Sequence, residues 1–140
     1  MVQQEVQLEA AAHAGALAGN TAQVDADLAA TSGLFGSAAS TVSLARRAAA
    51  VCGWLENDNR YDLAIALANR VLPQLTSAAE ASTSDREERL YWQGWLQGKV
   101  IDNKAAAITT LKAAEQLSPQ DERVVDLELE MVLAVQNFGH

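Results

Sequence analysis

A short motif occurs twice in this sequence, each time just before a polar turn. Gly53-Trp54-Leu55 recurs 41 positions later as Gly94-Trp95-Leu96. The segments after the turns align as well, Ala64-Ile65 with Ala107-Ile108, at a spacing of 43. Because this second spacing is larger, we expect the second turn to be two residues longer. Self-similarity of this kind predicts repeated structural units that stack and bury their apolar faces against each other.

A weaker third copy lies upstream. The spacing from Leu17 to Ala26 equals the spacing from Leu55 to Ala64. A single helical hairpin cannot bury its own apolar face, so hairpins stack, and the last one needs a closing helix with a polar outer face. We therefore expect three stacked helical hairpins and a C-terminal capping helix. Small residues should stand where the helices cross, and the candidates are Ala26, Ala64 and Ala107.

Composition and periodicity predict an all-α fold in a single domain spanning residues 1–140. The chain is 49% hydrophobic, mostly Ala, Leu and Val, and has two prolines. Residues 125–131 alternate apolar and charged side chains, which is a strand pattern. Leu, Glu and Met nevertheless favour helix there. The expected helices are 2–18, 21–31, 41–56, 60–75, 84–98, 103–117 and 119–138, with hairpins at 2–31, 41–75 and 84–117 and the capping helix at 119–138.

Several helix starts carry capping signals. Asn20 or Thr21 can cap the second helix. Ser84, with an acidic residue three positions later, predicts the start of the fifth helix. Ser118 followed by proline predicts the start of the last helix. Two Ser-rich segments, 32–37 and 76–84, are expected to be loops.

The C-terminal copy of the repeat carries the pattern of a known family. Tetratricopeptide repeats place a small residue, a large apolar residue, a second small residue and a terminal proline at fixed intervals. At these intervals this chain has Ala107, Leu111, Ala114 and Pro119, with Leu117 between the last two. The chain resembles the tetratricopeptide family well over residues 88–119 and loosely over residues 42–75. The resemblance implies a right-handed solenoid of helical hairpins that binds peptides or proteins.

The charge balance narrows the class of partner. The formal net charge is −8, and the ten Lys and Arg residues are scattered. Nucleic-acid binding needs clustered basic residues, so no nucleic-acid partner is expected. The sequence contains neither an apolar run long enough to span a membrane nor the pattern of a signal peptide. We expect a cytoplasmic location by default, or a periplasmic or secreted one if a signal peptide has been removed. The Ala-rich, Lys-poor composition favours a bacterial origin.

The sequence offers little for catalysis or metal binding. The two histidines, His13 and His140, lie far apart, and the single cysteine, Cys52, falls within a predicted helix. Free cysteine is commonly buried, so Cys52 is expected to be a small core residue. The acidic turn 56–62 lacks the glycine and the ligand spacing of a calcium loop. We therefore predict a non-catalytic chain with no metal and no cofactor.

The aromatic residues near position 92 are the best candidates for binding. Trp54 and Trp95 occupy equivalent repeat positions, which predicts a structural role. Tyr91 and Trp92 cannot both face one core, so one of them should be an exposed anchor. Arg46, Arg47 and the cations near these aromatic residues can bind an acidic partner, or the acidic surface of the chain can bind a basic one. The candidate partner-binding residues are Leu34, Phe35, Arg89, Tyr91, Trp92 and Lys99.

Three functions remain open at this point. The first is an adaptor or scaffold that binds a protein or peptide partner on the surface of the helical repeats. The second is a small-molecule binder with a pocket among the Trp residues. The third is self-assembly into a homo-oligomer, in which the end hairpins of neighbouring copies stack.

Overall fold

The structure, a computed structural model, describes residues 2–29, 36–76 and 82–138. These residues form seven α-helices and one π-helical turn, with no strand among them. The all-α prediction is confirmed, and residues 125–131 are helical. The helices are α1 (Val2–Leu17), α2 (Thr21–Ala29), α3 (Gly36–Asn57), α4 (Tyr61–Thr76), α5 (Thr83–Trp95), α6 (Lys104–Leu117) and α7 (Glu122–Phe138), and the π-helical turn (Leu96–Val100) follows α5.

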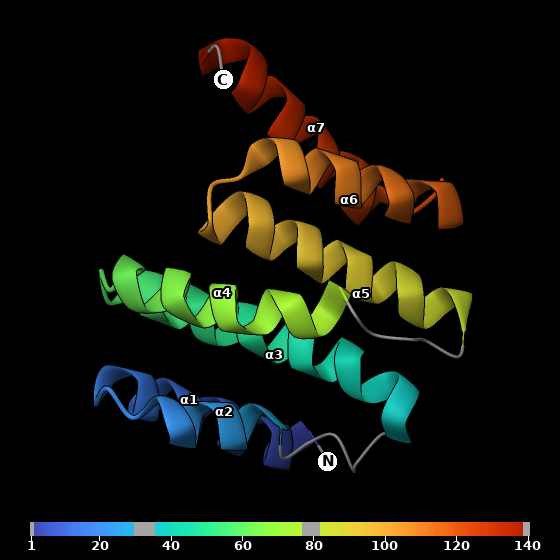
Figure 1. Ribbon diagram of the computed structural model, residues 1–140. Helices are drawn as coiled ribbons and strands as arrows, with labels where there is room; N and C mark the ends of the chain where they lie inside the picture. The colour runs from blue at the N-terminus through green and yellow to red at the C-terminus, as the bar shows by residue number, and fades with distance from the viewer. Residues whose placement is uncertain (1, 30–35, 77–81, 139–140) are drawn as a thin grey trace.

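Consecutive helices pack in pairs, and the pairs follow one another along the molecule (Figure 1). α1 pairs with α2, α3 with α4, and α5 with α6, while α7 packs on α6 at the far end. The first helices of the pairs also contact one another, α1 with α3 and α3 with α5. The two termini therefore lie at opposite ends of the stack.

Alanine fills much of the core between these helices. Ala12, Ala45, Ala48, Ala64 and Ala68 are all fully buried. Such small side chains let helix backbones approach closely, which suits a chain with few aromatic residues. Ala107 is likewise buried, as expected for a crossing position. The prediction for Ala26 is wrong, because Ala26 is exposed.

The first repeat aligns with the second at a spacing of 40, and the Leu17–Ala26 alignment is wrong. α1 ends with Gly19 at φ 78° and an Asn20 N–H bond to the Gly15 carbonyl. α3 ends in the same way, with Asn59 at φ 60° and an Arg60 N–H bond to the Leu55 carbonyl. This is a common helix-ending motif that needs one left-handed residue.

This spacing makes Val24 and Leu28 the equivalents of Ala64 and Ala68, and all four are buried. Leu17, in contrast, is 43% exposed.

The two additional residues between the second and third repeats are not in a longer polar turn. They extend the helix instead, through the π-helical turn Leu96–Val100. Leu96, Gly98 and Val100 of this turn are buried. The chain then turns at Asp102, which has φ 66°, and Asn103 caps α6 by accepting the Ala106 N–H.

Several helix starts differ from their predicted positions. α3 begins at Gly36, inside the segment expected to be a loop. Ser82 caps α5, two residues before the predicted Ser84, and accepts the Asp85 N–H. α7 begins after Asp121, whose carboxylate accepts the Arg123 N–H. Asn20 caps α2 as predicted, and it accepts the Gln23 N–H.

Candidate functional site: an aromatic groove across α3, α5 and α7

A hollow in the described part of the chain lies between α3 and α5. Its volume is about 560 Å³. Small residues of α3 contribute to its lining, Ala49, Ala50 and Gly53 among them. The polar lining residues are Arg46, Glu56 and Asn57. The aromatic lining residues are Trp54 of α3 and Tyr91, Trp92 and Trp95 of α5.

The aromatic side chains of α5 pack against one another and remain partly accessible. The Tyr91 and Trp92 rings meet edge to face, with centroids 4.9 Å apart. Trp92 and Trp95 meet at 6.2 Å in a similar arrangement. All three side chains are half-buried. Each ring therefore has a neighbour that fixes its orientation while part of its surface faces the groove.

Trp54 is also held in place by His13 of α1. The His13 ring lies 5.4 Å from the Trp54 ring, and His13 Nε2 lies 2.6 Å from Asp58 Oδ2. The contact joins α1 to the turn after α3, across 45 residues of sequence. His13 thus positions Trp54, a role that its place in an Ala-rich helix did not indicate.

A second hollow of about 250 Å³ lies between α5 and α7. Tyr91 and Trp95 line both hollows, so the two adjoin across α5. The remaining lining residues are Lys99, Arg123, Asp126, Leu127 and Glu130. Together the two hollows form one elongated surface over α3, α5 and α7, which we call the aromatic groove.

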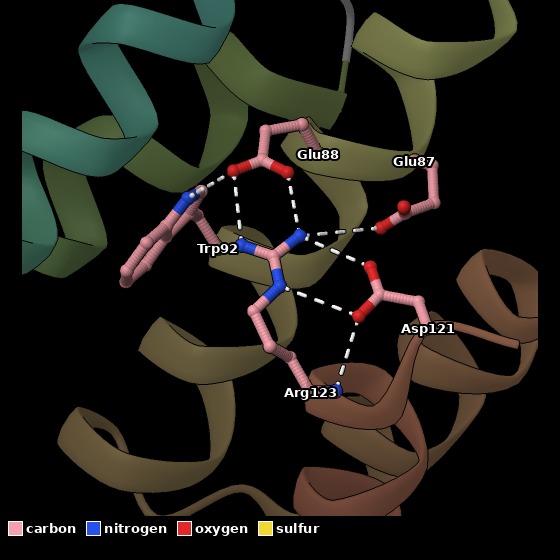
Figure 2. Close-up of polar contacts among 5 residues, drawn as sticks. All are labelled: Glu87, Glu88, Trp92, Asp121 and Arg123. Carbon is pink, nitrogen blue, oxygen red and sulfur yellow. Dashed lines mark hydrogen bonds and ion pairs between the residues drawn. The ribbon is translucent and has the colours of Figure 1, made fainter. Parts of the chain in front are cut away.

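A cluster of charged residues joins α7 to α5 beside the groove (Figure 2). The Arg123 guanidinium donates to both Glu88 oxygens, at 3.1 and 2.6 Å, and to both Asp121 oxygens, at 3.4 and 3.1 Å. Trp92 Nε1 donates to Glu88 at 3.2 Å. The guanidinium also lies 4.4 Å from the centre of the Tyr91 ring. This Arg123 cluster therefore fixes two of the groove's aromatic residues as well as α7.

The pKa values of the carboxyls in the Arg123 cluster move in opposite directions. Hydrogen bonds from Arg123 hold the pKa values of Glu88 and Asp121 below their usual range. Burial, together with a hydrogen bond to Asp121, raises the pKa of Glu87 to about 7. Burial also raises the pKa of Glu56 in the groove, and the nearby Lys99 opposes this shift.

The structure places the predicted binding residues in three different settings. Tyr91 and Trp92 both line the groove, and so do Trp54 and Trp95, whose repeat positions had indicated a purely structural role. Lys99 lines the second hollow and pairs with Glu130 at 2.6 Å.

Of the remaining candidates, Arg89 does not line the groove. Arg89 is buried and donates to Gln93 at 2.7 Å. Leu34 and Phe35 lie outside the described residues. Of the adjacent arginines, Arg46 lines the groove, whereas Arg47 is fully buried and points to the Leu28 carbonyl.

Cys52 is a core residue, as predicted. It is fully buried, and its Sγ donates to the Ala64 carbonyl at 3.4 Å. Burial raises the pKa of the thiol to about 12, so almost none of it is thiolate at neutral pH. Within the described ranges, no three His, Cys, Asp or Glu residues are grouped to hold a metal ion. No described helix has the length and apolar character needed to cross a membrane.

No protein-family model, no curated protein and no solved structure matches this chain.

Proposed function

We propose that this chain is a non-catalytic, tetratricopeptide-like interaction domain that binds a peptide segment of a partner protein in the aromatic groove. The observation that carries the proposal is the lining of the groove, in which three Trp and one Tyr lie on helices that follow one another in the stack. Trp and Tyr dominate binding energy at protein interfaces because they bury large surfaces at low entropic cost.

The shape of the groove favours a peptide over a compact ligand. Two adjoining hollows share Tyr91 and Trp95, so the lining extends from α3 across α5 to α7. An extended or helical segment can follow such a surface and place successive side chains along it. A volume of about 560 Å³ also falls in the usual range for small-molecule sites, so a metabolite in the α3–α5 hollow is the second candidate.

Gly53 provides a way to fill the groove without disturbing the core. It lines the hollow, and a Cβ added there would meet nothing within 4 Å. Leucine is a good helix former, so Gly53→Leu should leave α3 intact. Its side chain would occupy the space that a ligand needs.

The test is a selection of displayed random peptides on the immobilised full chain, followed by fluorescence anisotropy with the selected sequences. We expect peptides with micromolar affinity. Gly53→Leu and Trp54→Ala should each lower the affinity at least about tenfold, as expected for loss of an interface anchor. Ile65→Gln serves as the matched control, because Ile65 is 39% exposed on α4 and does not line the groove.

Two outcomes would contradict the proposal. One is the failure of any peptide to bind. The other is binding that Gly53→Leu leaves unchanged, which would place the ligand elsewhere. A metabolite panel monitored by Trp fluorescence tests the second candidate, and a saturable response abolished by Gly53→Leu would favour it over the peptide.

A further inference from the structure

The outward side of α7 carries a row of apolar side chains that nothing in the described chain covers. Val125, Leu129 and Leu133 are 36%, 53% and 45% exposed. They are four residues apart, so they lie on one side of the helix. The core side of α7 is formed by other residues, Val124 and Met131 among them, which are buried. We call the exposed row the α7 stripe. α7 itself is the last of the described helices and lies at one end of the stack (Figure 1).

Carboxylates flank the α7 stripe on both sides. Glu122, Asp126 and Glu130 are exposed and also four residues apart, so they form one edge. Glu128 forms the other edge, where it faces Glu115 of α6. Burial and the Glu115 charge raise the pKa of Glu128, with Lys112 opposing.

The cations near the α7 stripe offset part of this acidic character, since Lys112 opposes Glu128, and the exposed carboxylates of Glu122 and Asp126 carry the rest. Arg123 is held by Glu88 and Asp121, on the side of α7 that faces α5. Lys99 pairs with Glu130. The last turn of α7 contains no basic residue. A ligand for this surface therefore needs apolar residues to cover the stripe and positive charges to match its edges.

We propose that the α7 stripe is a docking site for a basic amphipathic helix of a partner protein. The stripe spans two turns, or about 12 Å along the helix axis, so a helix with leucine-type residues at three- and four-residue spacing can lie along it. Lysine or arginine on both sides of that row would reach the flanking carboxylates. A second copy of this chain fits poorly, because pairing two α7 stripes sets acidic edges against each other in a protein of net charge −8.

The experiment uses the full chain and a labelled synthetic helix with a leucine row between lysines. Fluorescence anisotropy at low salt should show saturable binding that weakens as salt increases. The double variant Leu129→Gln, Leu133→Gln should lower the affinity at least about tenfold. The double variant Glu122→Gln, Asp126→Asn should lower it several-fold and reduce the salt dependence. Because Asp126 also lines the hollow between α5 and α7, Glu122→Gln alone should give a smaller loss in the same direction. All four positions are exposed, so the fold should be retained.

Three controls separate this site from the aromatic groove. Ile65→Gln, an exposed apolar residue on α4, should leave the affinity unchanged. Gly53→Leu should also leave it unchanged, because Gly53 lines the groove between α3 and α5. A peptide with glutamate in place of lysine should not bind.

Each contrary result would overturn the proposal. These results are no binding of the lysine peptide, equal binding of the glutamate peptide, undiminished binding to Leu129→Gln, Leu133→Gln, and loss of binding in Gly53→Leu. If light scattering shows a dimer, and the double variant Leu129→Gln, Leu133→Gln is monomeric, the stripe would instead bind a second copy of the chain.

Discussion

Gly53 and Gly94 occupy equivalent positions in the two Gly-Trp-Leu triplets, but their surroundings differ. A Cβ added at Gly53 would meet open space, whereas one added at Gly94 would lie 2.7 Å from Cγ of Leu111. Such an approach is too close for carbon atoms, and Leu111 is fully buried, so it cannot move aside freely. The same repeat position therefore opens a groove in one copy and packs two helices closely in the other.

Alanine substitutions at these two glycines should have opposite effects on stability. Gly53→Ala should raise the free energy of unfolding by about 1 kcal/mol, because alanine favours helix over glycine by that amount. Gly94→Ala should lower it by about 1 kcal/mol, because overpacking costs up to about 3 kcal/mol and exceeds the same helix gain. Urea unfolding followed by circular dichroism measures both. A stabilising Gly94→Ala would contradict the close packing against Leu111.

Glu87 should make the stability of the protein depend on pH near neutrality. Its folded-state pKa of about 7 lies above its usual value of 4.5, so the folded state holds a proton that the unfolded state releases. Stability should therefore fall as pH rises from about 4.5 to 7 and level off above that. Glu87→Gln, which mimics the protonated side chain, should reduce this fall and stabilise the protein at pH 8 by about 1 kcal/mol. A smaller fall should remain, because the pKa values of Glu56 and Glu128 are also raised.

The measurement is urea unfolding of both proteins across pH 4 to 9. Glu88 and Asp121 have lowered pKa values, so their contributions are lost only below the usual carboxylate range and do not overlap this window. A fall of the same size in Glu87→Gln would show that another group is responsible.

At the scale of helices, α7 is attached to the stack by two kinds of contact. Leu127 and Met131 pack into the core shared with α6. The Arg123 cluster ties the first turn of α7 to α5. Three carboxylates meet at that guanidinium, so its removal would leave them facing one another in a partly buried site.

Arg123→Gln should lower the free energy of unfolding by about 1–2 kcal/mol, because it leaves partly buried carboxylates without their cation. Arg60→Gln is the matched control. Arg60 also pairs with a carboxylate, Asp62, but both are exposed and only two residues apart, so its loss should leave the stability essentially unchanged. Equal losses in the two variants would contradict the role of the Arg123 cluster.

Local patterns located the helices because periodicity and propensity act over short stretches of chain. They did not locate the cap of α5. Ser82 and Ser84 each have an acidic residue three positions later, so the sequence favours neither as the cap. In the structure Glu87 lies near Arg123 of a distant segment. The π-helical turn at Leu96–Val100 likewise has no signal in its own sequence, since its buried residues pack against helices on both sides.

The sequence predicted only part of the groove, because its shape also depends on contacts between distant residues. Tyr91 and Trp92 stand out as adjacent aromatic residues, and both line the groove. Whether Trp54 and Trp95 are fully covered depends on where α3, α5 and α7 come to lie. The contacts that set those positions join residues far apart, such as His13 with Asp58 and Arg123 with Glu88. No local pattern predicts such pairs.

At the scale of the whole molecule, the main contacts of each helix pair in the described residues are with its neighbours, so stability should vary along the stack. The two ends differ. α2 has nine residues and packs mainly on α1, and among its described side chains only Val24 and Leu28 are buried. α7 has 17 residues, buries Val124, Leu127 and Met131, and is tied to α5 by Arg123.

Native-state hydrogen exchange should therefore show strongest protection in α3–α6, intermediate protection in α7 and weakest protection in α2. Local opening follows the amount of buried apolar contact, and α2 is a short helix that buries two apolar side chains, whereas α7 buries three. Arg123→Gln should lower the protection of α7 while leaving α2 unchanged, because the main contacts of α2 involve neither α5 nor α7. Mass spectrometry of exchanged peptides measures each helix separately. Uniform protection from α1 to α7 would mean that the stack unfolds as one unit, and that the contacts between neighbouring pairs are strong enough to couple both ends.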